Sequence, residues 1–176
     1  MSDLVSPAQA LPIEVVRQII GHFVLELDTP IDRVSDLEHG LKELLSVCST
    51  WRQAATERLW ERIELTISSD SVVLNCPSWV EDNKLPHDVA PMVKEVHVIV
   101  PIALVSSGAA SEALAGYMGD MAKVENARKL VVTVNGHLEG VRLEARKNLA
   151  TAYAKELAGQ LKLVAPSLDQ TTTLVV

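Results

Sequence analysis

The chain has 176 residues and a mass of 19.1 kDa, enough for one ordinary domain or for a small module followed by part of a larger one. Hydrophobic residues make up 48% of the chain but aromatic residues only 3%, so the core must be aliphatic and an aromatic stacking surface for single-stranded nucleic acid is excluded. The formal net charge is −7, and the basic residues are not concentrated in any short window. This balance argues against binding to a nucleic-acid phosphate backbone.

The cysteines and the apolar segments indicate the compartment. Cys48 and Cys76 are far apart and neither has a CxxC partner, so the sequence indicates neither a disulfide framework nor a zinc site. The most apolar stretch, 96–105, contains a proline and is about half as long as a bilayer span. The N-terminus has no basic region followed by a long apolar run. We therefore expect a soluble protein in a reducing, intracellular compartment, without a membrane partner.

Residues 11–60 show helical periodicity, with a break near Ser49-Thr50, that predicts a compact bundle of about three helices. Pro12 suits the first turn of a helix, and 13–25 contains an apolar stripe at helical spacing. We expect this stripe to be buried; its members are Val16, Ile19, Ile20 and Phe23. Further apolar residues beside it give the helix more apolar surface than one contact can cover. The acidic stretch 26–40 is predicted to be a loop, and helical periodicity returns over 41–60.

The rest of the chain alternates short β-branched runs with helical segments. The predicted strands are 63–67, 96–100, 130–134 and 173–176, and the predicted helices between the later ones are 112–124 and 139–163. The first three strands begin 33 and 34 residues apart. This spacing predicts either a right-handed βαβ sheet or an α/β solenoid with parallel strands, and its regularity favours the solenoid. Because the sequence stops within the last strand, we expect a truncated array.

Four blocks of the N-terminal segment occur in an order typical of one family. They are Leu11-Pro12-x-Glu14-Val15 with Ile19-Ile20, then Leu41 to Leu45, then Val47-Cys48-x-x-Trp51-Arg52, and finally Leu59-Trp60 before Ile63. This order resembles the F-box, and the resemblance covers about 50 residues. The interval from Leu11 to Val47 is several residues longer than is usual in the family, and the surplus lies in the acidic stretch 26–40.

The resemblance implies a three-helix module that docks onto a Skp-type adaptor protein and, through it, onto a cullin-RING ubiquitin ligase. The adaptor-binding residues that it implies are Leu11, Pro12, Val15, Ile19, Val47, Cys48 and Trp51. F-box proteins of this layout commonly continue with leucine-rich or related repeats that bind the target protein. Here the repeat assignment depends on strand spacing, because the repeat consensus is poor.

We therefore predict an α+β or α/β chain with an N-terminal tail over 1–10, an F-box-like helical module over 11–60 and a repeat-like βα region over 61–176. The predicted function is a substrate-receptor subunit of an SCF-type ligase in the cytoplasm or nucleus. It would bind an adaptor and an unknown target protein. We expect no catalytic residue, metal, cofactor or nucleic-acid partner.

Simpler interpretations stay open beside this one. The stripe of Leu41, Leu44, Leu45 and Cys48 suits ordinary core packing, with Cys48 as a small buried hydrophobe. Trp51 and Trp60 are divided between core and adaptor contact. The five histidines are scattered, so we expect no metal site among them and expect most of them to be surface or incidental residues. Two rival functions remain. One is a small α/β ligand-binding protein or enzyme, with a nucleotide or phosphorylated ligand at the carboxyl ends of its strands and 106–108 as a weak anion-binding turn; the other is a scaffold with a degenerate box.

Overall fold

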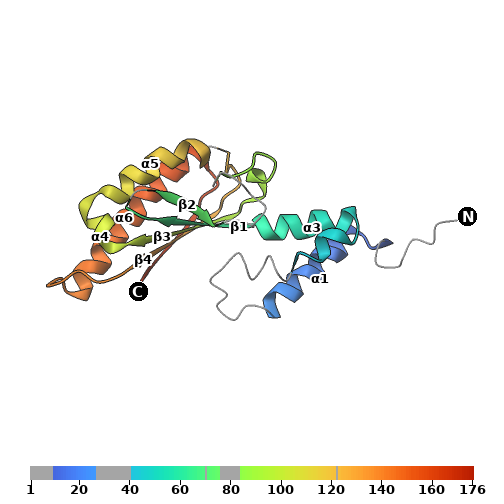
Figure 1. The fold of residues 1–176 in the computed structure, drawn as a ribbon, viewed down its shortest axis with the longest axis horizontal. Coiled ribbons are helices and arrows are strands. Elements are labelled where there is room, and N and C mark those ends of the chain that lie inside the picture. Colours follow the sequence, from blue (N-terminus) through green and yellow to red (C-terminus); the bar gives the residue numbers. More distant parts are fainter. Residues whose placement is uncertain (1–9, 27–40, 70, 76–83, 122) are drawn as a thin grey trace, which may run out of the picture. The chain divides into compact units, whose positions relative to one another are not determined.

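The computed structural model describes residues 10–26, 41–69, 71–75, 84–121 and 123–176 (Figure 1). The chain divides into two compact units, Met1–Glu61 and Arg62–Val176. Among the described residues, no helix combines the length and the apolar character needed to cross a membrane.

In its described residues, the first unit has two α-helices that pack against each other. They are α1 (Ile13–Glu26) and α3 (Ser49–Trp60), with a short 3-10 helix, η2 (Leu44–Ser46), before α3. Pro12 immediately precedes α1, and its carbonyl accepts hydrogen bonds from the N–H groups of Val15 and Val16 at 3.1 Å. This position suits proline, because a backbone N–H in the first turn of a helix has no hydrogen-bond partner within the helix and proline has no N–H to leave unpaired. The interior of this unit is apolar; its buried members are Val16, Ile20, Leu41, Ala54, Ala55, Leu59 and Trp60.

Two details of this unit differ from the sequence predictions. In the predicted buried stripe, Val16 and Ile20 are buried but Ile19 is 42% exposed, because α3 covers a narrower face of α1 than the apolar pattern suggests. The side chain of Phe23 lies outside the described residues. In the segment 41–48, the described helical part after Leu41 is only the 3-10 turn η2, where the Ser46 hydroxyl donates to the Glu43 carbonyl at 2.7 Å.

The second unit is a five-stranded sheet in the order β2-β1-β3-β4-β5. The strands are β1 (Arg62–Ile67), β2 (Val72–Asn75), β3 (Glu95–Pro101), β4 (Lys129–Asn135) and β5 (Gln170–Val175). β2 pairs with β1 as an antiparallel hairpin, and the other neighbours are parallel. The confirmed fold class is therefore mixed α/β with a mostly parallel sheet.

Three α-helices lie on one face of this sheet (Figure 1). They are α4 (Ile102–Ser107), α5 (Ala109–Met121) and α6 (Leu143–Val164), and a 3-10 helix, η3 (Ala90–Met92), precedes β3. The parallel strands advance in one direction, β1 to β3 to β4 to β5. Since crossovers between parallel strands are right-handed, successive connections in one direction place their helices on the same face.

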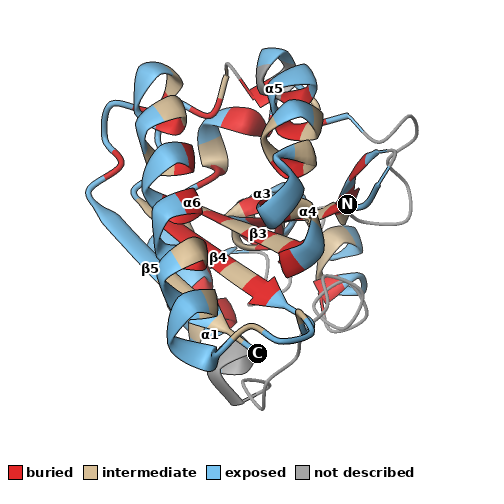
Figure 2. Ribbon diagram, turned by 90° about the vertical axis from the view of Figure 1, so that its left-hand side faces the viewer, coloured by how far each residue is buried: buried red, intermediate tan, exposed pale blue. Residues whose placement is uncertain are grey.

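The core of the second unit lies between the sheet and these helices. Figure 2 shows buried residues on β3 and β4 and exposed residues along the outer sides of α5 and α6. Alternate residues of the central strands are nearly inaccessible, among them Ile63, Leu65, Ile67, Val96, Val98, Val100, Leu130, Val132 and Val134. On α6 the buried side is Ala150, Tyr153, Ala154, Leu157 and Leu161. Every second residue of the strands and one side of α6 thus supply the side chains of a single aliphatic layer.

The predicted strands are present, with differences at the ends. The last strand begins at Gln170, three residues before the predicted start, and the short strand β2 was not predicted. A helix, α4, follows β3 directly, where no helix was predicted. The turn 106–108 is consequently not a loop between a strand and a helix. It ends α4, with Gly108 in the left-handed region at φ 79°, so the predicted anion-binding position is wrong.

Candidate functional site

The first candidate site is an apolar strip at the start of α1, which we call the α1 strip. Its members are Leu11 and Pro12, directly before the helix, and Val15 and Ile19 on it. Val15 and Ile19 are 39% and 42% exposed, Pro12 is exposed and Leu11 is half-buried. Val15 and Ile19 are four residues apart, so their side chains lie one above the other on the same side of the helix. Three of the four predicted residues are therefore exposed on their unit, and Leu11 is partly covered.

The opposite flank of α1 is polar and joined to α3. Arg17 donates two hydrogen bonds to the Glu57 carboxylate, from Nε at 2.7 Å and from Nη2 at 2.9 Å. Gln53 donates to the same carboxylate at 3.0 Å. The hydrogen bond from Arg17 to Glu57 raises the pKa of the guanidinium above its ordinary value. The buried seam of Val16 and Ile20 thus has an ion pair on one side and the α1 strip on the other.

The other predicted adaptor-binding residues lie at the start of α3. Val47 is 38% exposed, while Cys48 and Trp51 are half-buried. Cys48 is extended, with φ −164°, and its carbonyl accepts the N–H of Arg52 at 2.9 Å to begin α3. The Arg52 side chain donates from Nε to the Leu45 carbonyl at 2.9 Å. Arg52 therefore fixes the turn that presents Val47, a role that the motif alone did not indicate.

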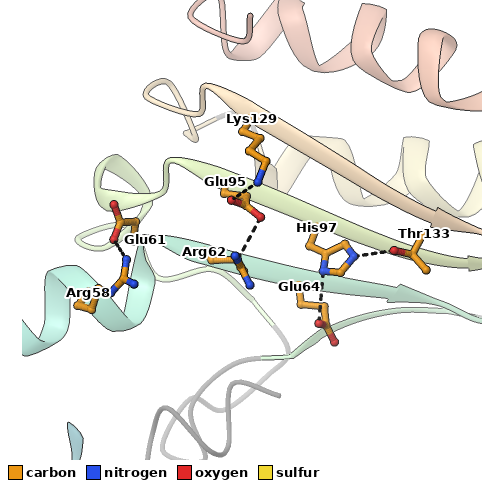
Figure 3. Close-up of polar contacts among 8 residues, drawn as sticks. All are labelled: Arg58, Glu61, Arg62, Glu64, Glu95, His97, Lys129 and Thr133. Carbon is orange, nitrogen blue, oxygen red and sulfur yellow. Dashed lines mark hydrogen bonds and ion pairs between the residues drawn. The ribbon is translucent and has the colours of Figure 1, made fainter. Parts of the chain in front are cut away.

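A second candidate site is the face of the sheet that points away from α4, α5 and α6, which we call the open face. Its first row of paired residues is Arg62, Glu95 and Lys129, on three neighbouring strands (Figure 3). One carboxylate oxygen of Glu95 forms an ion pair with Arg62 Nε, and the other accepts a hydrogen bond from Lys129 Nζ, both at 3.1 Å. The carboxylate is held between two cations.

A second polar group occupies the middle of the open face. Asn75 donates to a Glu64 carboxylate oxygen at 2.5 Å, and the other oxygen lies 3.7 Å from His97 Nδ1. His97 Nε2 is 2.8 Å from the Thr133 hydroxyl (Figure 3). His97 is thus part of a polar network, a role that the scattered positions of the histidines did not indicate. Its partners lie 33 and 36 residues away in sequence, so only the strand register brings them together.

The order carboxylate, imidazole and hydroxyl resembles the order of a hydrolytic triad, but the surroundings do not suit acyl transfer. The Glu64–His97 separation of 3.7 Å is too long for a hydrogen bond. Thr133 lies within a strand that is paired on both sides, so the backbone N–H groups around it belong to the sheet ladder and supply no oxyanion hole. The group is better explained as a satisfied polar network.

Two features of the rival ligand-binding interpretation are missing from the described residues. Their parallel strands advance in one direction, so they form no topological switch point of the kind that binds nucleotides in doubly wound sheets. The described part of the chain also contains no group of three or more His, Cys, Asp or Glu that could hold a metal ion.

Comparison with known proteins adds no assignment. No protein-family model matches the chain, and neither a curated protein nor a solved structure matches it. The functional argument therefore depends on residues and geometry.

Proposed function

We propose that the N-terminal unit is an F-box-type module that binds a Skp-type adaptor protein, and that the chain is a non-catalytic substrate receptor of an SCF-type cullin-RING ubiquitin ligase. The observation that supports this most directly is the exposure of Val15 and Ile19 beside the buried Val16 and Ile20. An exposed, ordered apolar strip is typical of a protein interface.

The energetics favour a partner for this unit. A helical unit of about 50 residues buries too little surface to be very stable alone. Complete burial of an aliphatic side chain contributes about 1.5–3 kcal/mol before the costs of association. Val15 and Ile19 are only partly buried in the unit itself, so part of this free energy is not yet gained. An adaptor that covers the two side chains would supply it.

The start of α3 would form a second contact with the adaptor. Val47 is the exposed apolar residue of this turn, and Cys48 and Trp51 are half-buried behind it. Arg52 holds the turn through its hydrogen bond to Leu45. In this proposal Val47 makes contact directly, and Trp51 divides its surface between the core and the adaptor.

The second unit would be a leucine-rich-repeat-like receptor for the target protein. Its parallel strands advance in one direction with the helices on one face, as they would in a short α/β solenoid. The receptor would act by raising the local concentration of target lysines near the ubiquitin-charged partner, while the covalent chemistry belongs to other subunits. No cofactor is required, and the site of action is the cytoplasm or nucleus.

Co-purification with a Skp-type adaptor tests the proposal. The full chain is compared with a Val15→Ser, Ile19→Ser double variant, and with Leu11→Ala, Pro12→Ala. Leu143→Ser, Leu163→Ser is the matched control, because both leucines are exposed on α6, at 51% and 84%. We expect the strip variants to recover about tenfold less adaptor, and the control to recover the normal amount. A native chain that captures no adaptor, or equal recovery with all variants, would contradict the proposal.

A further inference from the structure

The exposed charge at one end of the open face is positive, although the row contains a carboxylate. The side chains of Arg62 and Lys129 are 54% and 39% exposed, whereas that of Glu95 is 17% exposed. The two cations therefore lie outermost and the carboxylate lies beneath them. We propose that this end of the open face binds an acidic segment of a partner protein, which under the proposed function is the ubiquitination target.

The geometry leaves donors for a second carboxylate. The ion pair with Glu95 engages Nε of Arg62. Within the described part of the chain the two Nη groups of its guanidinium have no further partner, which leaves them for an external acceptor. Lys129 likewise gives one of its three N–H donors to Glu95. A carboxylate of the partner would be held in the same way as Glu95, by charge-assisted hydrogen bonds.

The neighbouring charges at this end of the sheet are of both signs, so the exposed side chains of Arg62 and Lys129 carry the argument. Lys94 and Arg128 directly precede β3 and β4, and both are exposed. Exposed carboxylates lie at this end as well: Asp169, whose N–H donates to the Arg128 carbonyl at 3.1 Å, and Glu125, whose carbonyl accepts from the Ser167 hydroxyl at 2.9 Å. Glu61, which precedes Arg62 in the chain, is paired with Arg58.

The remaining titratable groups that the structure describes on this face do not reverse the positive charge of Arg62 and Lys129. Glu64 and His97 lie in the next row and belong to the polar network with Asn75 and Thr133. A chain with a net charge of −7 thus presents a locally basic surface, which is complementary to an acidic partner.

An exposed apolar residue of the open face indicates a second feature of the partner segment. Lys129 pairs in register with Gln170, and Leu174, which is 48% exposed, lies four residues further along β5. At about 3.3 Å per residue, this separation is about 13 Å along the strand. An extended segment with an acidic residue four positions before an aliphatic one would reach both.

Peptide binding to the full chain tests this inference. The probe is a fluorescein-labelled ten-residue peptide with two adjacent glutamates and a leucine four positions after the second glutamate. The control peptide has lysines in place of the glutamates. We expect the acidic peptide to bind and an Arg62→Gln, Lys129→Gln variant to bind it about three- to tenfold more weakly. The difference should shrink between about 0.05 and 0.5 M salt, because exposed charges are screened.

Two further variants separate charge recognition from misfolding. Lys155→Gln, Lys162→Gln removes the same charge from exposed positions of α6 and should leave binding within about twofold. A triple variant, Arg62→Gln, Glu95→Gln, Lys129→Gln, leaves no unpaired carboxylate in the row. It should stay folded, as judged by circular dichroism, and should bind the acidic peptide as weakly as the double variant does. Equal binding of the lysine peptide, or equal weakening by the α6 control, would overturn the inference.

The outcome is distinguishable from failure of the proposed function. Recovery of the Skp-type adaptor should be the same for the native chain and for Arg62→Gln, Lys129→Gln, because these residues belong to the second unit. Light scattering that shows a dimer abolished by the same two substitutions would identify a second copy of the chain as the occupant, and would overturn the inference.

Discussion

Ile19 and Ile20 are adjacent in α1 and lie in opposite environments: Ile19 is 42% exposed and Ile20 is 1% exposed. The difference arises because successive residues of a helix are rotated by about 100°, and α3 covers only the side that carries Ile20. The two residues have the same chemistry and nearly the same position in the chain. Any difference in stability or binding between the same substitution at Ile19 and at Ile20 therefore arises from the difference in burial.

Substitution of each residue by alanine separates stability from binding. Ile20→Ala should lower the free energy of unfolding of the first unit by about 2–5 kcal/mol, because it leaves a cavity between α1 and α3. Ile19→Ala should change that free energy by less than about 0.5 kcal/mol, yet reduce adaptor recovery. Urea unfolding followed by tryptophan fluorescence measures the first effect. Equal destabilisation by the two substitutions would place Ile19 in the core.

The predictability of the fold differs between its elements. The runs around Leu65, Val98 and Val132 were predicted as strands because β-branched and aliphatic residues crowd into windows of five. β2 was missed because it has only four residues. The hydrogen bond from Ser68 N–H to the Ser71 carbonyl closes the tight turn that joins it to β1. A search for two short runs around a serine turn could have found it.

The start of α4 could not be predicted from hydrophobicity. The apolar run continues from β3 through Ile102 and Val105, so its composition is the same on both sides of the boundary. Pro101, with φ −64° and ψ 135°, ends the strand and begins the helix. Proline suits both roles, so the residue type alone does not decide between them.

The candidate sites were predictable to different degrees. The α1 strip was expected from a surplus of apolar residues around one helix, but periodicity gave the wrong side for Ile19, because the side that is covered depends on where α3 docks. The ion pairs of Glu95 and the network of His97 needed the register of three strands. No local pattern contains that information, since the residues concerned are separated by more than 30 positions.

Gly108 and Gly116 form a matched pair for a backbone test. Gly108 ends α4 with φ 79°, whereas Gly116 lies within α5, and a Cβ would meet no atom within 4 Å at either position. Gly108→Ala should therefore destabilise the second unit by about 1–2 kcal/mol through backbone strain alone. Gly116→Ala should stabilise it by about 0.5–1 kcal/mol, because alanine is the better helix former. Thermal unfolding measures both, and a loss in both variants would contradict this explanation.

Tyr153 carries a buried hydroxyl on α6 that has no hydrogen-bond partner among the described residues. A buried hydroxyl without a partner costs about 1–3 kcal/mol of desolvation. Tyr153→Phe removes this cost and keeps the ring in the core. We expect the variant to be as stable as the native chain, or more stable by up to about 1 kcal/mol, in urea unfolding at neutral pH. A clear loss of stability would show that the hydroxyl is hydrogen-bonded.

The same side chain predicts a pH dependence at high pH. Desolvation, with a smaller contribution from Glu156, raises the pKa of Tyr153 from its ordinary value of 10.0 to about 12. The folded state thus favours the protonated hydroxyl more than the unfolded state does. This contribution to stability is fully present below pH 10 and is lost as the pH rises towards about 12. The native chain should therefore lose more stability than Tyr153→Phe between these pH values, as measured by urea unfolding at each pH. Parallel pH profiles for the two proteins would show that the hydroxyl titrates normally.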